Sequence, residues 1–161
     1  MIFEFSGVTD WLSEVGAGIT QITKIEPVTY NGKELAKIEF ATARGNGSGL
    51  YRNDTPPLTQ ICRACGFPAR AGDRLDSQQL IGRKFWGVWG VRIGARDGYT
   101  YADLAAAHPI PADAVEWRSL TDAEWAAIGR APDGVKLSEK QKTAENKPVT
   151  QAPKEDDDFP F

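Results

Sequence analysis

The stretch "VTYNGKELAKIEF", residues 28–40, decides the class of fold because it predicts a β-hairpin. Asn31-Gly32 separates two strand-like runs, and this dipeptide suits the positive φ angles of a type I′ turn. A second stretch, "VRIGARDGYTYADL" at residues 91–104, has an Asp-Gly pair in the same role. The two hairpins together predict four strands, over residues 19–30, 34–43, 82–95 and 99–104.

A helix is predicted between the two hairpins, over "TPPLTQICRACGF" at residues 55–67. Thr55 can cap this helix, the two prolines suit its first turn, and Gly66 can end it. Its apolar side chains share one face at helical spacing: Leu58, Ile61, Cys62 and Cys65. Residues 44–49, which precede it, are too rich in glycine for regular structure and predict a mobile loop.

The remainder of the chain divides into a folded part and a polar tail. "TDAEWAAIG" at residues 121–129 predicts a short helix with Thr121 and Glu124 as a capping box. From Ala131 onward apolar residues almost vanish, so this part cannot bury enough surface to offset its ordering entropy. We therefore predict a folded domain, a disordered linker and a C-terminal tip, over residues 1–130, 131–155 and 156–161.

These elements predict a mainly β fold that contains a small antiparallel barrel. Two hairpins with a helix between them suit the five-stranded oligonucleotide-binding (OB) fold, whose helix lies between strands 3 and 4. A fifth strand must then come from residues 110–120 or from the start of the chain. The acidic C-terminal tail is predicted to stay disordered outside the barrel.

Charge is distributed unevenly along the 161 residues, although the net charge is only −3. Residues 33–96 hold eleven Lys and Arg against five acids, whereas the segments on either side are net acidic. A basic middle between acidic flanks is an electrostatic footprint for a polyanion. The sequence therefore favours nucleic acid as a partner.

The strand "RKFWGVWGVRI", residues 83–93, carries the chemistry that a nucleic-acid site needs. Successive side chains of a strand point to opposite faces. One face is predicted to be core and carries Phe85, Trp89, Val91 and Ile93. The other face carries Lys84, Trp86, Val88 and Arg92. Cations follow phosphates and flat rings stack on bases, so the second face predicts a site for single-stranded nucleic acid.

Two alternatives remain open for this strand. It can be a core strand that is buried on both faces, with its charged ends reaching to water. A bulge at Gly87 or Gly90 would exchange the faces and place Trp89 in the binding groove instead of Trp86. A second candidate site is the basic and aromatic surround of the glycine-rich segment, which carries Arg44, Tyr51 and Arg52.

Other chemistries find little support in the sequence. Cys62 and Cys65 form a CxxC pair, but zinc needs two more ligands and a redox site needs a βαβ setting, so we interpret them as partly buried thiols. No catalytic constellation surrounds His108. Asp73 and Asp76 fit a salt-bridged surface turn better than a metal pair. The sequence thus predicts a non-catalytic protein without a metal or cofactor.

No targeting or membrane signal is found in the sequence. The start, "MIFEFSGVTDWL", lacks the basic and apolar regions of a signal peptide. No stretch reaches the roughly 18 apolar residues that span a bilayer. Both observations predict a cytoplasmic protein. The sequence leaves homo-oligomer formation open.

The last residues, "EDDDFPF", resemble the C-terminus of bacterial and phage single-stranded DNA-binding proteins. Those proteins share an OB domain, a disordered linker and a final run of acids followed by an aromatic or Ile, Pro and Phe. Phe159 stands where many bacterial members have isoleucine. The other matching residues are Asp156, Asp157, Asp158, Pro160 and Phe161. The resemblance implies a phage-type protein of DNA replication, recombination or repair.

The tip also has the chemistry of a docking peptide. An apolar pocket beside an Arg or Lys can capture the free carboxylate and Phe161 together, and Pro160 lowers the entropy lost on docking. The resemblance implies that the tip recruits replication, recombination and repair proteins. Two alternatives to DNA binding stay open: an RNA-binding OB protein, and an adaptor with a docking tail that binds no nucleic acid.

Overall fold

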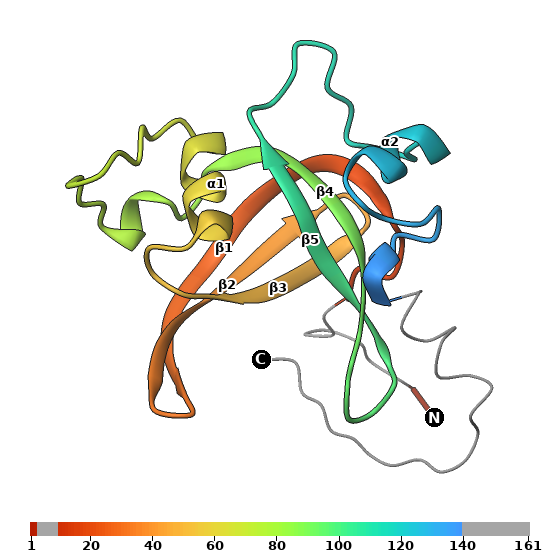
Figure 1. Ribbon diagram of the computed structural model, residues 1–161, viewed down its shortest axis with the longest axis horizontal. Helices are drawn as coiled ribbons and strands as arrows, with labels where there is room; N and C mark the ends of the chain where they lie inside the picture. The colour runs from red at the N-terminus through yellow and green to blue at the C-terminus, as the bar shows by residue number, and fades with distance from the viewer. Residues whose placement is uncertain (3–9, 140–161) are drawn as a thin grey trace.

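The computed structural model describes residues 1–2 and 10–139 (Figure 1). Its main feature is an antiparallel β-sheet to which short helices are added. The predicted mainly β class is confirmed. Within the described residues, no helix is long and apolar enough to cross a membrane.

Six strands form the sheet in the described part of the chain. They are β1 (Gly16–Tyr30), β2 (Lys33–Thr42), β3 (Gly45–Tyr51), β4 (Lys84–Ile93), β5 (Thr100–His108) and β6 (Trp117–Arg118). Hydrogen-bonded neighbours follow the order β3-β2-β1-β4-β5, and the two-residue β6 pairs with the start of β1. These ladders make an open sheet, and β3 and β5 stand at the two ends of this strand order.

The two predicted hairpins are present, with one tight turn and one longer connection. Asn31 and Gly32 join β1 to β2 with φ angles of 51° and 75°, as a type I′ turn requires. The β4–β5 connection is longer than predicted and runs from Gly94 to Tyr99, where the Gly94 N–H donates to the Tyr99 carbonyl at 2.8 Å. The other strand ends agree with prediction to within four residues.

The helix α1 (Pro56–Ala64) lies between β3 and β4, as predicted. Prolines occupy its first turn, and Gly66, with a φ angle of 99°, follows its end. Thr55 stands at the N-cap, but its hydroxyl donates to the Arg52 carbonyl instead of capping the helix. Cys62 and Cys65 are buried free thiols, and burial raises the pKa of both, that of Cys65 to about 11.

The main core lies between the inner face of the sheet and α1. The Phe40 ring meets the rings of Tyr51, Phe85 and Trp89 edge to face, with centroids 6.4, 5.8 and 5.5 Å away. Trp89 is fully buried, and its indole N–H donates to the Thr20 hydroxyl at 3.1 Å. The predicted core positions of Phe85 and Trp89 are confirmed.

The glycine-rich segment forms a strand, and the prediction of a mobile loop over residues 44–49 was wrong. From Gly45 onward it pairs with β2 along the whole length of β3. Gly47 packs against Trp89, and a Cβ there would stand 2.7 Å from the ring. In a strand, glycine can mark a close approach of the backbone rather than a break in structure.

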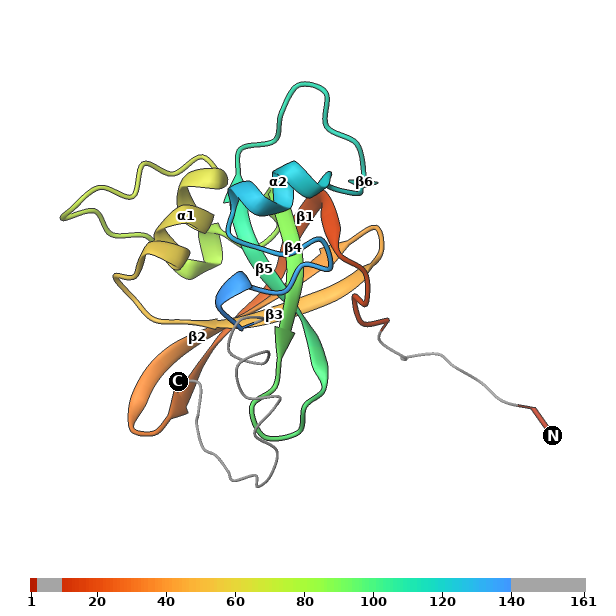
Figure 2. The same ribbon diagram turned by 45° about the vertical axis from the view of Figure 1, so that its right-hand side comes forward.

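A second apolar cluster lies on the other face of β4. It is covered by α2 (Asp122–Ala127), which lies near β4 in Figure 2. Trp86 packs there with Ala17 and Trp125. The predicted capping box of α2 is confirmed, since the Thr121 hydroxyl accepts the Glu124 N–H and the Glu124 carboxylate accepts the Thr121 N–H. The middle of β4 is therefore buried on both faces, as one of the two alternatives predicted.

The folded part of the chain continues beyond residue 130, the predicted end of the domain. Val135 is buried and bridges Val91 of β4. Arg130, which is 5% exposed, donates to the Asp103 carboxylate of β5 at 2.7 Å. This ion pair and bridge attach the chain after α2 to β4 and β5.

Candidate nucleic-acid interface

The side chains of the predicted binding face of β4 differ in their exposure to solvent. Lys84 and Arg92 are exposed near its two ends, whereas Trp86 between them is only 7% exposed. The Arg118 guanidinium lies 5.9 Å from the centre of the Trp86 ring, and Trp86 also packs in the apolar cluster that α2 covers. Trp86 therefore presents no open ring to a base, which corrects its predicted place on an exposed face.

The alternative in which Trp89 faces the groove does not hold either, because Trp89 is fully buried. The register shift along the β4–β5 ladder falls between Val88 and Trp89, not at Gly87 or Gly90. Ile93, predicted to be core, is 41% exposed. It lies at the end of β4, where the hairpin extends past the core.

The second set of candidate residues lies around β3, and the structure places some of them on the surface and one in the core. Arg44, in the turn before β3, forms an ion pair with Glu14 at 3.7 Å. Tyr51 turns inward, and burial, aided by the negative charge of Asp103, raises the pKa of its hydroxyl. Arg52 is exposed directly after β3. The two arginines remain candidates for a surface site, and Tyr51 belongs to the core.

Four other aromatic side chains are exposed among the described residues, and the sequence analysis missed all of them. Trp11 is 66% exposed and Tyr99 is 68% exposed, while Tyr30 and Tyr101 are 38% and 39% exposed. The three tyrosines lie beside the predicted hairpin turns, and this position in the sequence could have predicted that they are exposed. Trp11 lies beside the start of β3, where it bridges Asn46.

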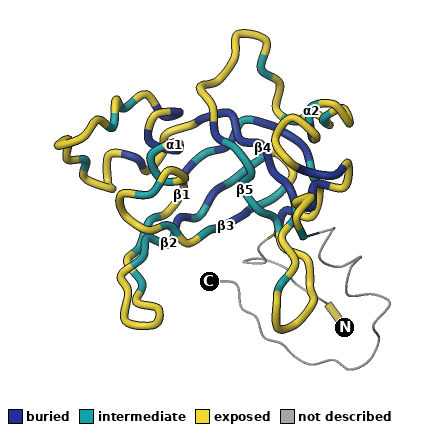
Figure 3. The backbone as a smooth tube through the Cα atoms, in the orientation of Figure 1, coloured by how far each residue is buried: buried dark blue, intermediate teal, exposed yellow. Residues whose placement is uncertain are grey.

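The β1–β2 and β4–β5 hairpins extend from the same end of the molecule (Figures 1 and 2). Both tips are exposed (Figure 3). They carry rings and cations together: Tyr30, Lys33, Arg92, Arg96, Tyr99 and Tyr101. We call these residues, with the outer face of β2 and β3, the hairpin surface.

The outer face of β2 and β3 is assigned from the alternation of side chains. Ile38 and Phe40 point into the core, so Lys37 and Glu39 point outward. Leu50 lies opposite Lys37 in the β2–β3 ladder and is 52% exposed. This face mixes apolar and charged groups, and the exposed tyrosines stand on the hairpins beside it.

Three contacts organise the side chains of the β4–β5 hairpin. Arg92 and Tyr101 lie opposite each other in the ladder, with the guanidinium 4.8 Å from the ring centre. The Tyr101 hydroxyl donates to the Asp97 carboxylate, which also accepts the Tyr99 N–H at 2.9 Å. The bond to Tyr101 is the main cause that lowers the pKa of Asp97, and it raises the pKa of the Tyr101 hydroxyl.

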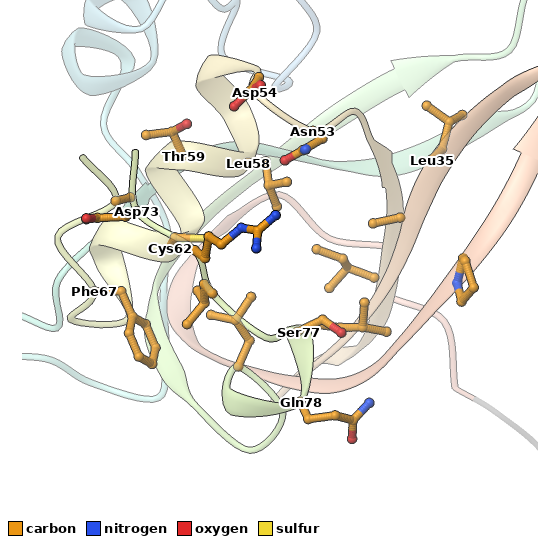
Figure 4. A pocket seen from close by; sticks show the side chains of 18 of the residues that line it. Leu35, Asn53, Asp54, Leu58, Thr59, Cys62, Phe67, Asp73, Ser77 and Gln78 are labelled. Atoms are coloured by element: carbon orange, nitrogen blue, oxygen red, sulfur yellow. The ribbon is translucent and has the colours of Figure 1, made fainter. Parts of the chain in front are cut away.

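The described residues also line a cavity of about 650 Å³ between the β1–β2 hairpin, α1 and the segment before β4 (Figure 4). Its apolar lining includes Leu35, Leu58, Cys62 and Phe67. Its charged lining comprises Glu26, Glu34, Asp54, Asp73, Arg70 and Arg74. Because carboxylates outnumber guanidinium groups there, the cavity does not suit a polyanion, and we place it outside the candidate interface.

In comparisons with known proteins, no family model and no curated protein matches this chain. Within residues 10–139, no group of three or more His, Cys, Asp or Glu side chains is placed to hold a metal ion. The predicted docking tip, residues 156–161, and the linker from residue 140 to 155 lie outside the described residues. The hairpin surface is therefore the candidate site that the described chain offers.

Proposed function

We propose that this protein binds single-stranded DNA without catalysis and coats it during replication, recombination or repair. The observation that carries the proposal is the gathering of exposed rings and cations on two hairpins at one end of the molecule. Rings stack on unpaired bases and cations follow phosphates, whereas a duplex hides the faces of its bases. The basic stretch from residue 33 to 96 supports the same partner.

The proposed DNA contacts differ from those that the sequence put forward. Exposed rings proposed to stack on bases are Trp11, Tyr30 and Tyr99. Cations of the hairpin surface proposed to contact phosphates are Lys33, Arg92 and Arg96, and the exposed Lys84, Arg44 and Arg52 are proposed as further contacts outside it. Side chains now given a role in the core are Trp86, Trp89 and Tyr51. The proposed interface thus uses exposed side chains on and beside the hairpins and leaves the middle of β4 to packing.

The finer architecture that we propose is a five-stranded OB barrel. The order β1-β2-β3-α1-β4-β5 supports it, as do the antiparallel pairings along the sheet and the short separation between β3 and β5. A closed barrel requires hydrogen bonds between β3 and β5. Hydrogen exchange tests this: slow exchange of the β3 amides that face β5 supports closure, and fast exchange contradicts it.

The C-terminal tip is proposed to recruit replication, recombination or repair proteins in the cytoplasm of a bacterial host. Three acids, a proline and two phenylalanines stand at residues 156–161. An apolar pocket next to a cation suits the rings and acids of this segment, and the acids speed encounter with a basic partner. The resemblance to phage and bacterial single-stranded DNA-binding proteins supports this role.

Fluorescence anisotropy of a labelled dT oligonucleotide, measured at several NaCl concentrations, tests the proposed function. We expect binding that weakens as salt rises and that is much tighter than binding to a duplex of the same length. Competition by oligo-U separates the RNA-binding alternative, which predicts stronger competition by RNA than by DNA. Absence of binding to any oligonucleotide at low salt would overturn the proposal and favour the adaptor.

A further inference from the structure

Arg92 is an exposed cation whose side chain is nonetheless held in place. Its guanidinium lies over the Tyr101 ring, opposite it in the β4–β5 ladder. A free arginine side chain loses rotamer entropy on binding a phosphate, and a side chain held beforehand loses less. The ring beneath Arg92 is itself fixed, because its hydroxyl donates to the carboxylate of Asp97.

We propose that Asp97 is a positioning residue of the hairpin surface: through the Tyr101 hydroxyl it holds the ring beneath Arg92 and so prepares that guanidinium for a DNA phosphate. The inference rests on the proposed function and deepens it by naming the group that organises the cation. Asp97 also accepts the Tyr99 N–H at 2.9 Å, which ties the hairpin tip to the start of β5. Tyr99 itself stays open, with 68% of its surface exposed.

The proposed role of Asp97 and its charge alone predict opposite changes in DNA affinity when the side chain is removed. An acid beside a polyanion site repels the ligand, so its removal alone would strengthen DNA binding. If Asp97 instead positions Arg92, its removal weakens binding despite the gain of one unit of net charge. The two accounts of the same side chain therefore predict opposite changes in affinity.

Two variants and a matched control separate these accounts in the full-length protein. Tyr101→Phe keeps the ring and every charge but removes the hydrogen bond to Asp97. Asp97→Ala removes the carboxylate. Asp113→Ala makes the same charge change in the exposed β5–β6 connection, at the opposite end of the molecule from the hairpin tips (Figure 1). Thermal unfolding of each variant confirms that it is folded before its affinity for oligo-dT is measured.

We expect Tyr101→Phe and Asp97→Ala to bind oligo-dT about three- to tenfold more weakly, the change that corresponds to roughly one net hydrogen bond. Asp113→Ala should bind with unchanged or slightly higher affinity. The slope of log K against log salt should fall by about 0.7 in Tyr101→Phe, the value for one phosphate contact to a single strand. A merely structural role of the hydrogen bond would leave this slope unchanged.

A double-mutant cycle with Arg92→Ala completes the test, because a residue that acts through Arg92 has no further effect once Arg92 is absent. Tyr101→Phe should therefore cost nothing more in the Arg92→Ala background. Unchanged affinity of Tyr101→Phe, additive losses, or tighter binding by Asp97→Ala would each overturn the positioning role while the proposed function stands. A wild-type protein that binds no oligo-dT would overturn both.

Discussion

Gly47 lies directly against the indole of Trp89, so that a Cβ at this position would stand 2.7 Å from two carbons of the ring. Carbon atoms in favourable contact are about 3.5–4.0 Å apart. Trp89 is fully buried and its indole N–H is held by the Thr20 hydroxyl at 3.1 Å, so the ring has no room to move aside. β3 can cover this core because residue 47 is glycine.

Gly47→Ala is therefore expected to destabilise the fold by about 1–3 kcal/mol, the cost of overpacking a tight core. Urea unfolding followed by circular dichroism measures this change. Ser48→Ala is the matched control, because the neighbouring side chain points to the outer face of the sheet, and it should stay within about 0.5 kcal/mol of the wild type. Equal losses in the two variants would show that strand propensity, not the contact with Trp89, decides stability.

Trp86 and Trp11 are expected to have opposite roles in stability and binding. Trp86→Ala should cost about 3–5 kcal/mol of unfolding free energy, because the side chain is buried beneath α2. Trp11→Ala should leave stability nearly unchanged but weaken oligo-dT binding by on the order of 1–3 kcal/mol if a base stacks on it. The paired measurement is urea unfolding and anisotropy for both variants. A stable Trp86→Ala protein with lost DNA binding would restore the original interpretation of β4.

The Arg130–Asp103 ion pair is expected to stabilise the fold more than an exposed pair does. Arg130 is 5% exposed and also donates to the Gly134 carbonyl at 2.9 Å, so Arg130→Met leaves several groups without their donor. We expect a loss of about 3 kcal/mol in unfolding free energy and faster hydrogen exchange at Val135. Arg44→Met breaks an exposed pair as the control and should change stability by less than about 1 kcal/mol.

The Glu124 carboxylate is expected to make α2 sensitive to acid. A hydrogen bond from Arg118, followed by one from the Thr121 N–H, lowers the pKa of Glu124 from 4.5 to about 2. The folded state therefore holds the charged form more strongly than the unfolded state does. This contribution is fully present above about pH 4.5 and is lost as pH falls towards 2. Thermal midpoints measured over this range should fall less steeply in Glu124→Gln than in the wild type.

Features set by neighbouring residues could be predicted from the sequence. The Asn31-Gly32 turn, the prolines that begin α1, and the capping box of α2 each depend on a few consecutive positions. Such signals act through local backbone geometry, so they gave β1, β2, β4, β5 and both helices without knowledge of the tertiary structure. The order of these six elements followed directly from them.

Features set by contacts distant in sequence could not be predicted in the same way. Strand alternation gave two faces for β4 but not the fact that Trp125, 39 residues after Trp86, covers one of them. Gly47 lies in a glycine-rich segment of the kind that is typical of loops. Its close contact with Trp89, which leaves no room for a side chain, follows only from the tertiary structure. Strand alternation also did not predict that Tyr30, Tyr99 and Tyr101 are exposed, because their rings lie beside hairpin turns that extend past the core.

Deletion of residues 156–161 is expected to separate partner recruitment from DNA binding. The deletion removes three acids and the aromatic anchor together. Capture of replication or repair proteins from a host lysate should be abolished. Affinity for oligo-dT should be unchanged or higher, because an acidic competitor for the cations of the hairpin surface is gone, and the gain should be larger at low salt, where charge is least screened.

Phe161→Ala is expected to separate the two effects of the tip, which are partner capture and competition with DNA, by changing a single side chain. It should abolish partner capture, since the anchor is lost, yet retain most of the competition with DNA, which comes from the acids. Anisotropy with oligo-dT and pull-down from lysate are compared for three proteins: wild type, truncated and Phe161→Ala. Weaker DNA binding by the truncated protein would show that the tip contributes to the DNA site, and the docking-peptide account would have to be replaced.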